Sequence, residues 1–143
     1  MIMLIKEVNG NSKYEIRNSK QKRCLIIMMD YNLQKRTIEF SKNSIIFAKK
    51  LPVNHISRPI ITQYIKCSSS IGANYCEANN AESKADFRHK ISISRKESQE
   101  TCYWLEIMKT TFEEFTPEII VLLKEATELN LILSKILLNS KDK

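Results

Sequence analysis

The clearest pattern of apolar and small positions in this chain runs from Phe87 to Phe115, spaced alternately four and three residues apart without a break. This spacing keeps one stripe of an α-helix facing a neighbouring helix over four heptads. We therefore predict a long helix over residues 84–114 that packs nearly parallel or antiparallel to its neighbours. The stripe consists of Phe87, Ile91, Ser94, Ser98, Thr101, Leu105, Met108, Phe112 and Phe115.

Three other stretches repeat at helical spacing, over residues 31–51, 58–80 and 117–139. Pro52 should end the first of these, and Pro59 and Pro117 should lie in the first turns of the next two. Helices of roughly 20–30 residues joined by short links pack as antiparallel neighbours. The predicted fold class is therefore all-α, an antiparallel up-down-up-down four-helix bundle formed by residues 30–143.

The links between these helices carry helix-start residues. Ser83 is a predicted N-cap, with Asp86 three residues later where a capping-box acid belongs. Ser57 and Thr116 are the predicted N-caps of the second and fourth helices. These signals place the helix starts close to residues 58, 84 and 117.

A stripe of small residues surrounds Gly72 in the second helix. Glycine inside a helix costs about 1 kcal/mol relative to alanine, so we expect a neighbouring backbone to approach closely here. We predict that this neighbour is the small, polar middle of the 84–114 helix. The stripe consists of Ser69, Gly72, Ala73 and Cys76.

Residues 1–29 show no sustained helical or strand period. We interpret them as a disordered leader, or as the product of a misassigned start codon with Met28 or Met29 as the true start. A third interpretation is a basic arm that binds nucleic acid.

Composition narrows the class of protein. The chain has 143 residues, enough for one domain, and its 2 glycines and 3 prolines are too few for a sheet-rich fold. Its 4 cysteines form no CxxC pair, which indicates reduced, mostly buried thiols and a cytoplasmic protein. No apolar run is long enough to predict a membrane span.

The net charge of +7 favours a polyanionic partner. Glu97 and Glu100 interleave with the basic residues of the third helix and would weaken such binding, and a solvated lysine face is the alternative interpretation. Any binding should be to backbone phosphate. The candidate contacts are Lys35, Arg36, Lys42, Lys84, Arg88, Lys90, Arg95 and Lys96.

Residues typical of catalytic or metal sites do not form a set in this sequence. Asp86 and His89 have the acid-x-x-His spacing of di-iron bundles, but such sites need two of these motifs, and the other histidine, His55, falls in a predicted link. We expect Asn74 to hydrogen-bond across the bundle and Glu77 to pair with a nearby base such as Lys84 or Arg88. We therefore predict no enzyme activity, no catalytic residues, no metal and no cofactor.

Several segments together resemble the four-helix-bundle family of 23S rRNA intervening-sequence proteins, whose relatives include the accessory variability protein of diversity-generating retroelements. The segments are Arg36–Phe40, Ser69–Tyr75, Glu77–Ala78, Ser83–Phe87, Lys96–Ser98, Glu100–Thr101 and Tyr103–Leu105, and the resemblance covers about residues 30–140. It implies a small antiparallel four-helix bundle that assembles as a homopentameric ring. It also implies nucleic acid as a partner of some members, and a reverse transcriptase as the partner of the retroelement relative.

Two functions are consistent with these observations. The first is a non-enzymatic bundle that self-associates and binds structured RNA or DNA through a basic helical face, as a chaperone or adaptor for structured RNA or a reverse transcriptase. The second is a protein-interaction module without affinity for nucleic acid. Its contact surface, or the oligomer interface, would use Phe40, Phe47, Tyr103 and Trp104.

Overall fold

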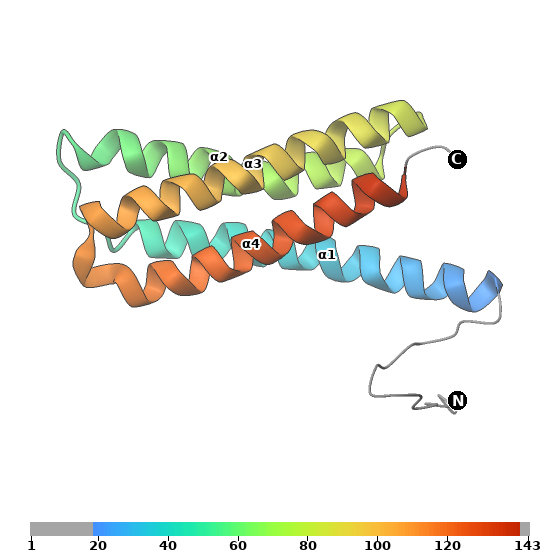
Figure 1. The fold of residues 1–143 in the computed structure, drawn as a ribbon, viewed down its shortest axis with the longest axis horizontal. Helices are drawn as coiled ribbons and strands as arrows, with labels where there is room; N and C mark the ends of the chain where they lie inside the picture. The colour runs from blue at the N-terminus through green and yellow to red at the C-terminus, as the bar shows by residue number, and fades with distance from the viewer. Residues whose placement is uncertain (1–18, 141–143) are drawn as a thin grey trace, which may run out of the picture. The chain divides into compact units, whose positions relative to one another are not determined.

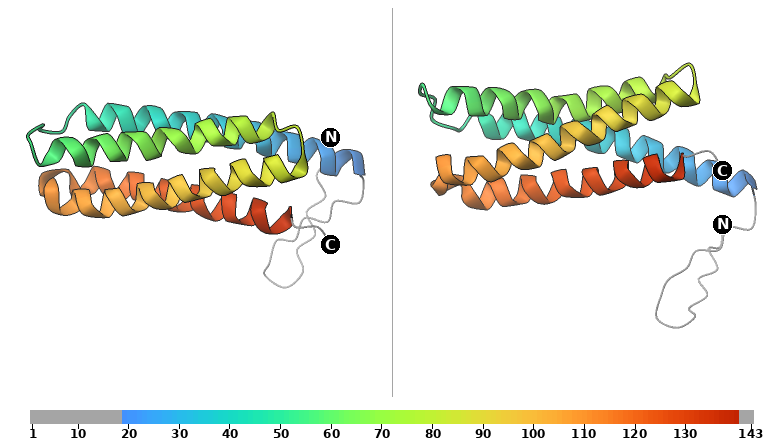
Figure 2. Two further views of the ribbon diagram at one scale, coloured as in Figure 1. Left: turned by 90° about the horizontal axis from the view of Figure 1, so that it is seen from above. Right: turned by 45° about the horizontal axis from the view of Figure 1, so that its top comes forward.

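The structure is a computed structural model that describes the backbone of residues 19–140 and the side chains of residues 32–140. The chain divides into two compact units, residues 1–33 and 34–143. The described elements are α1 (Ser19–Ala48), α2 (Ser57–Asn79), α3 (Lys84–Thr111), the short 3-10 helix η1 (Glu113–Phe115) and α4 (Thr116–Asn139). Within the second unit, consecutive helices run in opposite directions (Figures 1 and 2). The predicted all-α four-helix bundle is confirmed.

Polar contacts join each helix of the second unit to the next and join α4 back to α1, so the four helices close into a bundle. Each contact uses a polar side chain of one helix that reaches the neighbouring helix. From α1 round to α4 they are Ser41 Oγ to the Ser68 carbonyl at 3.3 Å, Ser94 Oγ to the Ile71 carbonyl at 2.8 Å, Asn130 Nδ2 to Ser98 Oγ at 2.8 Å, and Arg36 to Glu125.

The core contains hydroxyl groups as well as apolar side chains. Thr37, Ser98 and Thr101 are fully buried beside apolar residues such as Ile91 and Leu105. Each of these three hydroxyls donates to a carbonyl three or four residues earlier on its own helix. All three therefore keep an acceptor although they are buried. The small hydroxyl residues therefore act as core residues.

Gly72 faces α1. A Cβ atom added at Gly72 would lie 3.2 Å from Thr37 Oγ1 and 3.3 Å from Thr37 Cβ. The expected close approach of a neighbour is present, but the prediction that this neighbour is the middle of α3 is wrong. The middle of α3 meets α2 at Ile71, one residue earlier and about 100° around the helix.

The start of α2 differs from the prediction because Asn54 is its cap. The Asn54 side-chain oxygen accepts from the backbone N–H groups of Ile56 and Ser57 at 2.8 and 2.9 Å. Ser57 Oγ in turn accepts from the Asn54 N–H at 2.8 Å, which makes a reciprocal capping box. Ser57 is thus the second residue of the capping box, and its side chain accepts from the backbone N–H of the cap residue Asn54.

The other two predicted caps have opposite outcomes. Ser83 is the N-cap of α3, with extended backbone and its side chain accepting from the Asp86 N–H at 3.1 Å. Thr116 is not a cap, because its hydroxyl donates to the Glu113 carbonyl and α4 has no side-chain cap. The turn η1 leads directly into α4, and α3 ends at Thr111, three residues earlier than predicted.

The first helix begins earlier than predicted. The structure places its start at Ser19, so residues 19–29 of the expected leader are helical. These residues contain no proline or glycine and include good helix formers such as Lys22, Arg23 and Leu25, so a helix can extend through them. Residues 1–18 lie outside the described part of the chain, and the misassigned start stays a prediction.

Candidate nucleic-acid interface

The basic residues predicted on α1 are mostly engaged within the chain. Arg36 donates to Glu125 Oε2 at 2.8 Å and also pairs with Glu128, both on α4. These carboxylates raise the pKa of the guanidinium above its ordinary value. Lys42 pairs with Glu39 at 3.0 Å on its own helix. Carboxylates of this chain thus already pair with Arg36 and Lys42, which makes both less available to phosphate, and their role as phosphate contacts stays a prediction.

Lys35 is an exposed residue of α1. Its position is about 100° around the helix from Arg36, on the side away from α4. It does not join the basic residues of α3 described next.

A groove between α3 and α4 brings two of the predicted residues together. Arg88 and Arg95 lie two turns apart on α3 and share one side of that helix. The space between them and α4 is about 560 Å³. The lining residues are Ala85, Arg88, His89, Ser92 and Arg95 of α3 with Ser134, Leu137 and Leu138 of α4.

The lining of this groove contains no carboxylate. Glu97, which was expected to neutralise the basic row, is roughly half a turn around α3 from Arg88 and Arg95. It faces α2, where the charge of Lys66 acts on it, although burial and Glu100 raise its pKa overall. The groove therefore has an uncompensated positive charge.

Contacts with α4 position both arginines. Arg88 NH1 donates to Ser140 Oγ at 3.1 Å and to the Leu137 carbonyl at 3.4 Å, where the last carbonyls of α4 favour a cation. The Arg95 carbonyl accepts from Asn130 Nδ2 at 3.1 Å, which fixes the two helices at this level. The buried Arg95 Nε has no hydrogen-bond partner within the described chain. Arg95 thus keeps donor capacity for a ligand.

The remaining predicted residues of α3 separate into two groups. Lys96 is exposed one position beyond Arg95, and Lys84 is exposed in the first turn of the helix. Lys90 instead pairs with Glu77 on α2, which raises its pKa. The expectation that Glu77 pairs with a nearby base is therefore confirmed, with Lys90 as the base.

Asn74 also differs from expectation. Its side-chain amide donates to the Ser70 carbonyl at 2.9 Å, within its own helix. The predicted hydrogen bond across the bundle is therefore wrong.

Of the four aromatic residues predicted to form an interface, the two on α1 are buried and the two on α3 reach the surface. Phe40 and Phe47 are only 2% and 4% exposed, and Phe47 packs edge-on against Tyr64, so both belong to the core. Their assignment to an interface is wrong because α1 turns both rings inward. Tyr103 is 58% exposed on α3, and Trp104 beside it is half-buried.

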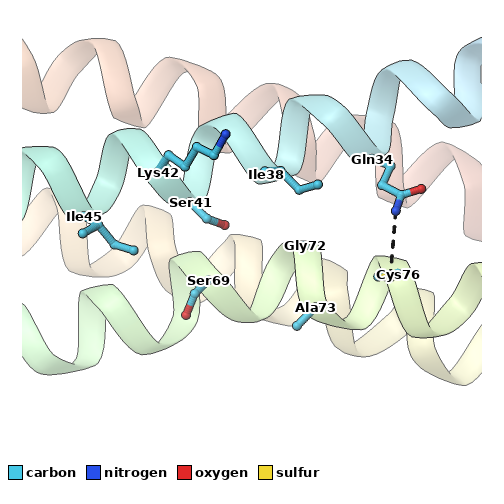
Figure 3. A pocket seen from close by; sticks show the side chains of 9 residues that line it. All are labelled: Gln34, Ile38, Ser41, Lys42, Ile45, Ser69, Gly72, Ala73 and Cys76. Carbon is cyan, nitrogen blue, oxygen red and sulfur yellow. Dashed lines mark hydrogen bonds between the residues drawn. The ribbon is translucent and has the colours of Figure 1, made fainter.

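A second groove lies between α1 and α2 and is mainly apolar. Its volume is about 350 Å³, and Figure 3 shows Ile38 on α1 across from Gly72 and Ala73 on α2, with Ile45 further along α1 toward the Ser69 end of the groove. Both isoleucines remain more than 40% exposed. The small residues of α2 keep the floor of this groove low. Its lining is Gln34, Ile38, Ser41, Lys42, Ile45, Ser69, Gly72, Ala73 and Cys76.

The described residues contain no group of three or more His, Cys, Asp or Glu side chains that could hold a metal ion. In the same part of the chain, no helix combines the length and the apolar character needed to cross a membrane.

Comparison with known proteins identifies the family of this chain. The family model of the 23S rRNA-intervening sequence protein matches residues 29–135. The chain belongs to this family. One similar solved structure is a protein of unknown function from the S23 ribosomal protein family of Bacteroides thetaiotaomicron VPI-5482. It is 31% identical, covers 73% of this chain and 97% of its own, and superposes with a TM-score of 0.65. A comparison with curated proteins finds no match.

Membership of this family confirms the resemblance seen in the sequence. The homopentameric ring, the nucleic-acid partner and the reverse-transcriptase partner stay predictions.

Proposed function

We propose that this protein is a non-enzymatic bundle that binds the phosphate backbone of RNA or DNA through the groove between α3 and α4. The observation that supports this function best is the lining of the groove, which holds Arg88, His89 and Arg95 and no carboxylate. Arginine presents a planar fork of donors that matches phosphate oxygens, and Arg95 has an unused buried donor. The protein would act as an adaptor or chaperone for a folded nucleic acid.

The charge of the neighbouring surface supports the same proposal. Lys96 on α3 and Lys135 on α4 are both exposed close to the groove in sequence. They extend the positive surface beyond the two arginines. Binding that depends on such charges should weaken steeply with salt, since each phosphate contact releases a condensed counterion.

The test is fluorescence anisotropy with a labelled RNA hairpin and a labelled DNA duplex at low and moderate salt. Arg95→Gln and Lys96→Gln should each weaken binding and reduce the slope of log affinity against log salt by about 1. Lys49→Gln removes the same charge from an exposed position in the turn just after α1 and should leave binding unchanged. Circular dichroism checks that each variant keeps its helices. Equal binding by all three variants, or no binding at low salt, would contradict the proposal.

We further propose that self-association uses the apolar groove between α1 and α2. The exposed Ile38 and Ile45 flank a floor of small residues, into which a helix of a second copy could insert side chains. Ile38→Glu should lower the oligomer mass measured by light scattering, whereas Ile120→Glu, equally exposed on α4, should not. An unchanged mass for Ile38→Glu would exclude this groove as the interface.

A further inference from the structure

An exposed aromatic ring continues the basic surface along α3. His89, Lys96 and Tyr103 are all exposed and follow one another at intervals of seven residues. Seven residues are nearly two full turns, so the three side chains share one outer stripe, about 10.5 Å apart along the helix axis. Tyr103 is also within about a quarter of a turn of Arg88 and Arg95.

The α4 side of this stripe carries a lysine, and the two carboxylates of α3 nearest to Tyr103 both accept hydrogen bonds from α3. Cys102, next to Tyr103, contacts Thr127 of α4, with its sulfur 3.8 Å from the threonine hydroxyl. Lys124, one turn before Thr127, is exposed. Glu100 and Glu106 are the nearby carboxylates of α3, each three residues from Tyr103. Glu100 accepts from the Trp104 indole N–H, and Lys109 donates to both oxygens of Glu106.

Tyr103 is held in place although it is exposed. Its ring contacts Trp104 edge-on, with centroids 5.2 Å apart. Trp104 is itself fixed by a 3.1 Å hydrogen bond from its indole N–H to Glu100. A ring that is 58% exposed and already positioned loses little conformational freedom when a flat ligand stacks on it.

From this arrangement we infer that the bound nucleic acid contains unpaired bases, and that one of them stacks on Tyr103 while its phosphates follow Lys96, Arg95 and Arg88. This inference rests on the proposed function of the α3–α4 groove. Bases inside a continuous duplex already stack on one another, so an exposed protein ring can reach only an unpaired base. A cationic groove beside an aromatic platform is the usual arrangement for binding a single strand.

The probes are a labelled oligoadenylate and the duplex that it forms with oligouridylate, each titrated with the full chain. Tyr103→Ala should weaken binding of the single strand roughly 5- to 150-fold and leave duplex binding nearly unchanged. Tyr103→Phe keeps the ring and should bind like the unmodified chain. Ile46→Ala removes an exposed apolar side chain from α1 and is the matched control.

Trp104 supplies a second readout, since it is the sole tryptophan of the chain and touches Tyr103. Its emission should change with the oligoadenylate and much less with the duplex. If Tyr103→Ala binds the single strand normally while Arg95→Gln does not, the stacking inference is overturned and the groove function stands. If the unmodified chain binds neither probe, both are overturned.

Discussion

Gly72 on α2 lies so close to Thr37 on α1 that a methyl group at Gly72 would meet Thr37 Cβ at 3.3 Å. Thr37 is fully buried and bonded to the Gln34 carbonyl, so it has little room to move. We predict that Gly72→Leu lowers the free energy of unfolding by about 1–3 kcal/mol by forcing the two helices apart. Urea denaturation measures this. Ser69→Leu adds similar bulk at an exposed position of α2 and should change it by less than about 0.5 kcal/mol.

The pairing of Arg36 with Glu125 and Glu128 should stabilise the α1–α4 contact modestly. Arg36 is 31% exposed, so solvent screens the pair and its contribution should be about 1 kcal/mol. Arg36→Gln is expected to lower the melting temperature more at low salt than at high salt. Lys42→Gln breaks an exposed pair within α1 and serves as the control, with a smaller loss. Equal melting curves for the two variants would argue against a role for the interhelical pair.

The reciprocal bonds of Asn54 and Ser57 predict coupled substitutions at the start of α2. Asn54→Ala should cost about 1 kcal/mol of stability because two backbone N–H groups lose their acceptor. Ser57→Ala should cost a similar amount, since Ser57 also donates to the Pro52 carbonyl at 2.8 Å. In a double-mutant cycle followed by chemical denaturation, the joint loss should be smaller than the sum. Strictly additive losses would show that the two residues act separately.

Cys67 makes stability depend on pH in the alkaline range. Burial raises the pKa of its thiol to about 11 from an ordinary value of 9.0. The unfolded chain therefore releases this proton first, and the free energy of unfolding should fall as pH rises from about 9 to about 11. Two pKa units correspond to about 3 kcal/mol.

Urea denaturation across this pH range measures the effect of Cys67. Tyr64, whose pKa burial also raises, adds to the loss above its ordinary value of 10.0. Cys67→Ala should remove the contribution of Cys67, so that the free energy of unfolding depends less steeply on pH. The prediction fails if the variant and the unmodified chain lose stability equally between pH 9 and 10.

Periodicity predicted the buried side of α3 because it reports directly which residues share a side of a helix. Ile91, Ser94, Leu105 and Met108 all follow the predicted spacing and are all fully buried. The same reasoning failed on α1, where Thr37 and Ser44 complete the buried stripe with Phe40 and Phe47. Phe40 and Phe47 were assigned to an interface, although the 3-4-3 spacing from Thr37 to Phe47 puts these four residues on one side of the helix.

The sequence predicted the residues that α3 contributes to the candidate site, but not those that α4 contributes. Arg88 and Arg95 could be assigned to one side of α3 by their spacing, since both belong to one helix. The contribution of Ser134 and Leu137 depends on how far α4 slides along α3, which Asn130 and Arg88 fix through contacts between helices. Spacing within one helix carries no information on that register. The position of Glu97 half a turn away from Arg88 and Arg95 could have been found from the helical angle alone.

The hydroxyl-rich interior has a consequence for how this sequence can vary. Thr37 and Thr101 each donate to a carbonyl of their own helix, so replacing one by alanine removes the buried donor and its need for an acceptor together. Such replacements should be nearly independent of one another, and the interior can change one position at a time. Ser94 and Ser98 are different, because Ser94 bonds α3 to the Ile71 carbonyl of α2 and Ser98 accepts from Asn130 of α4, so the loss of either would affect two helices at once.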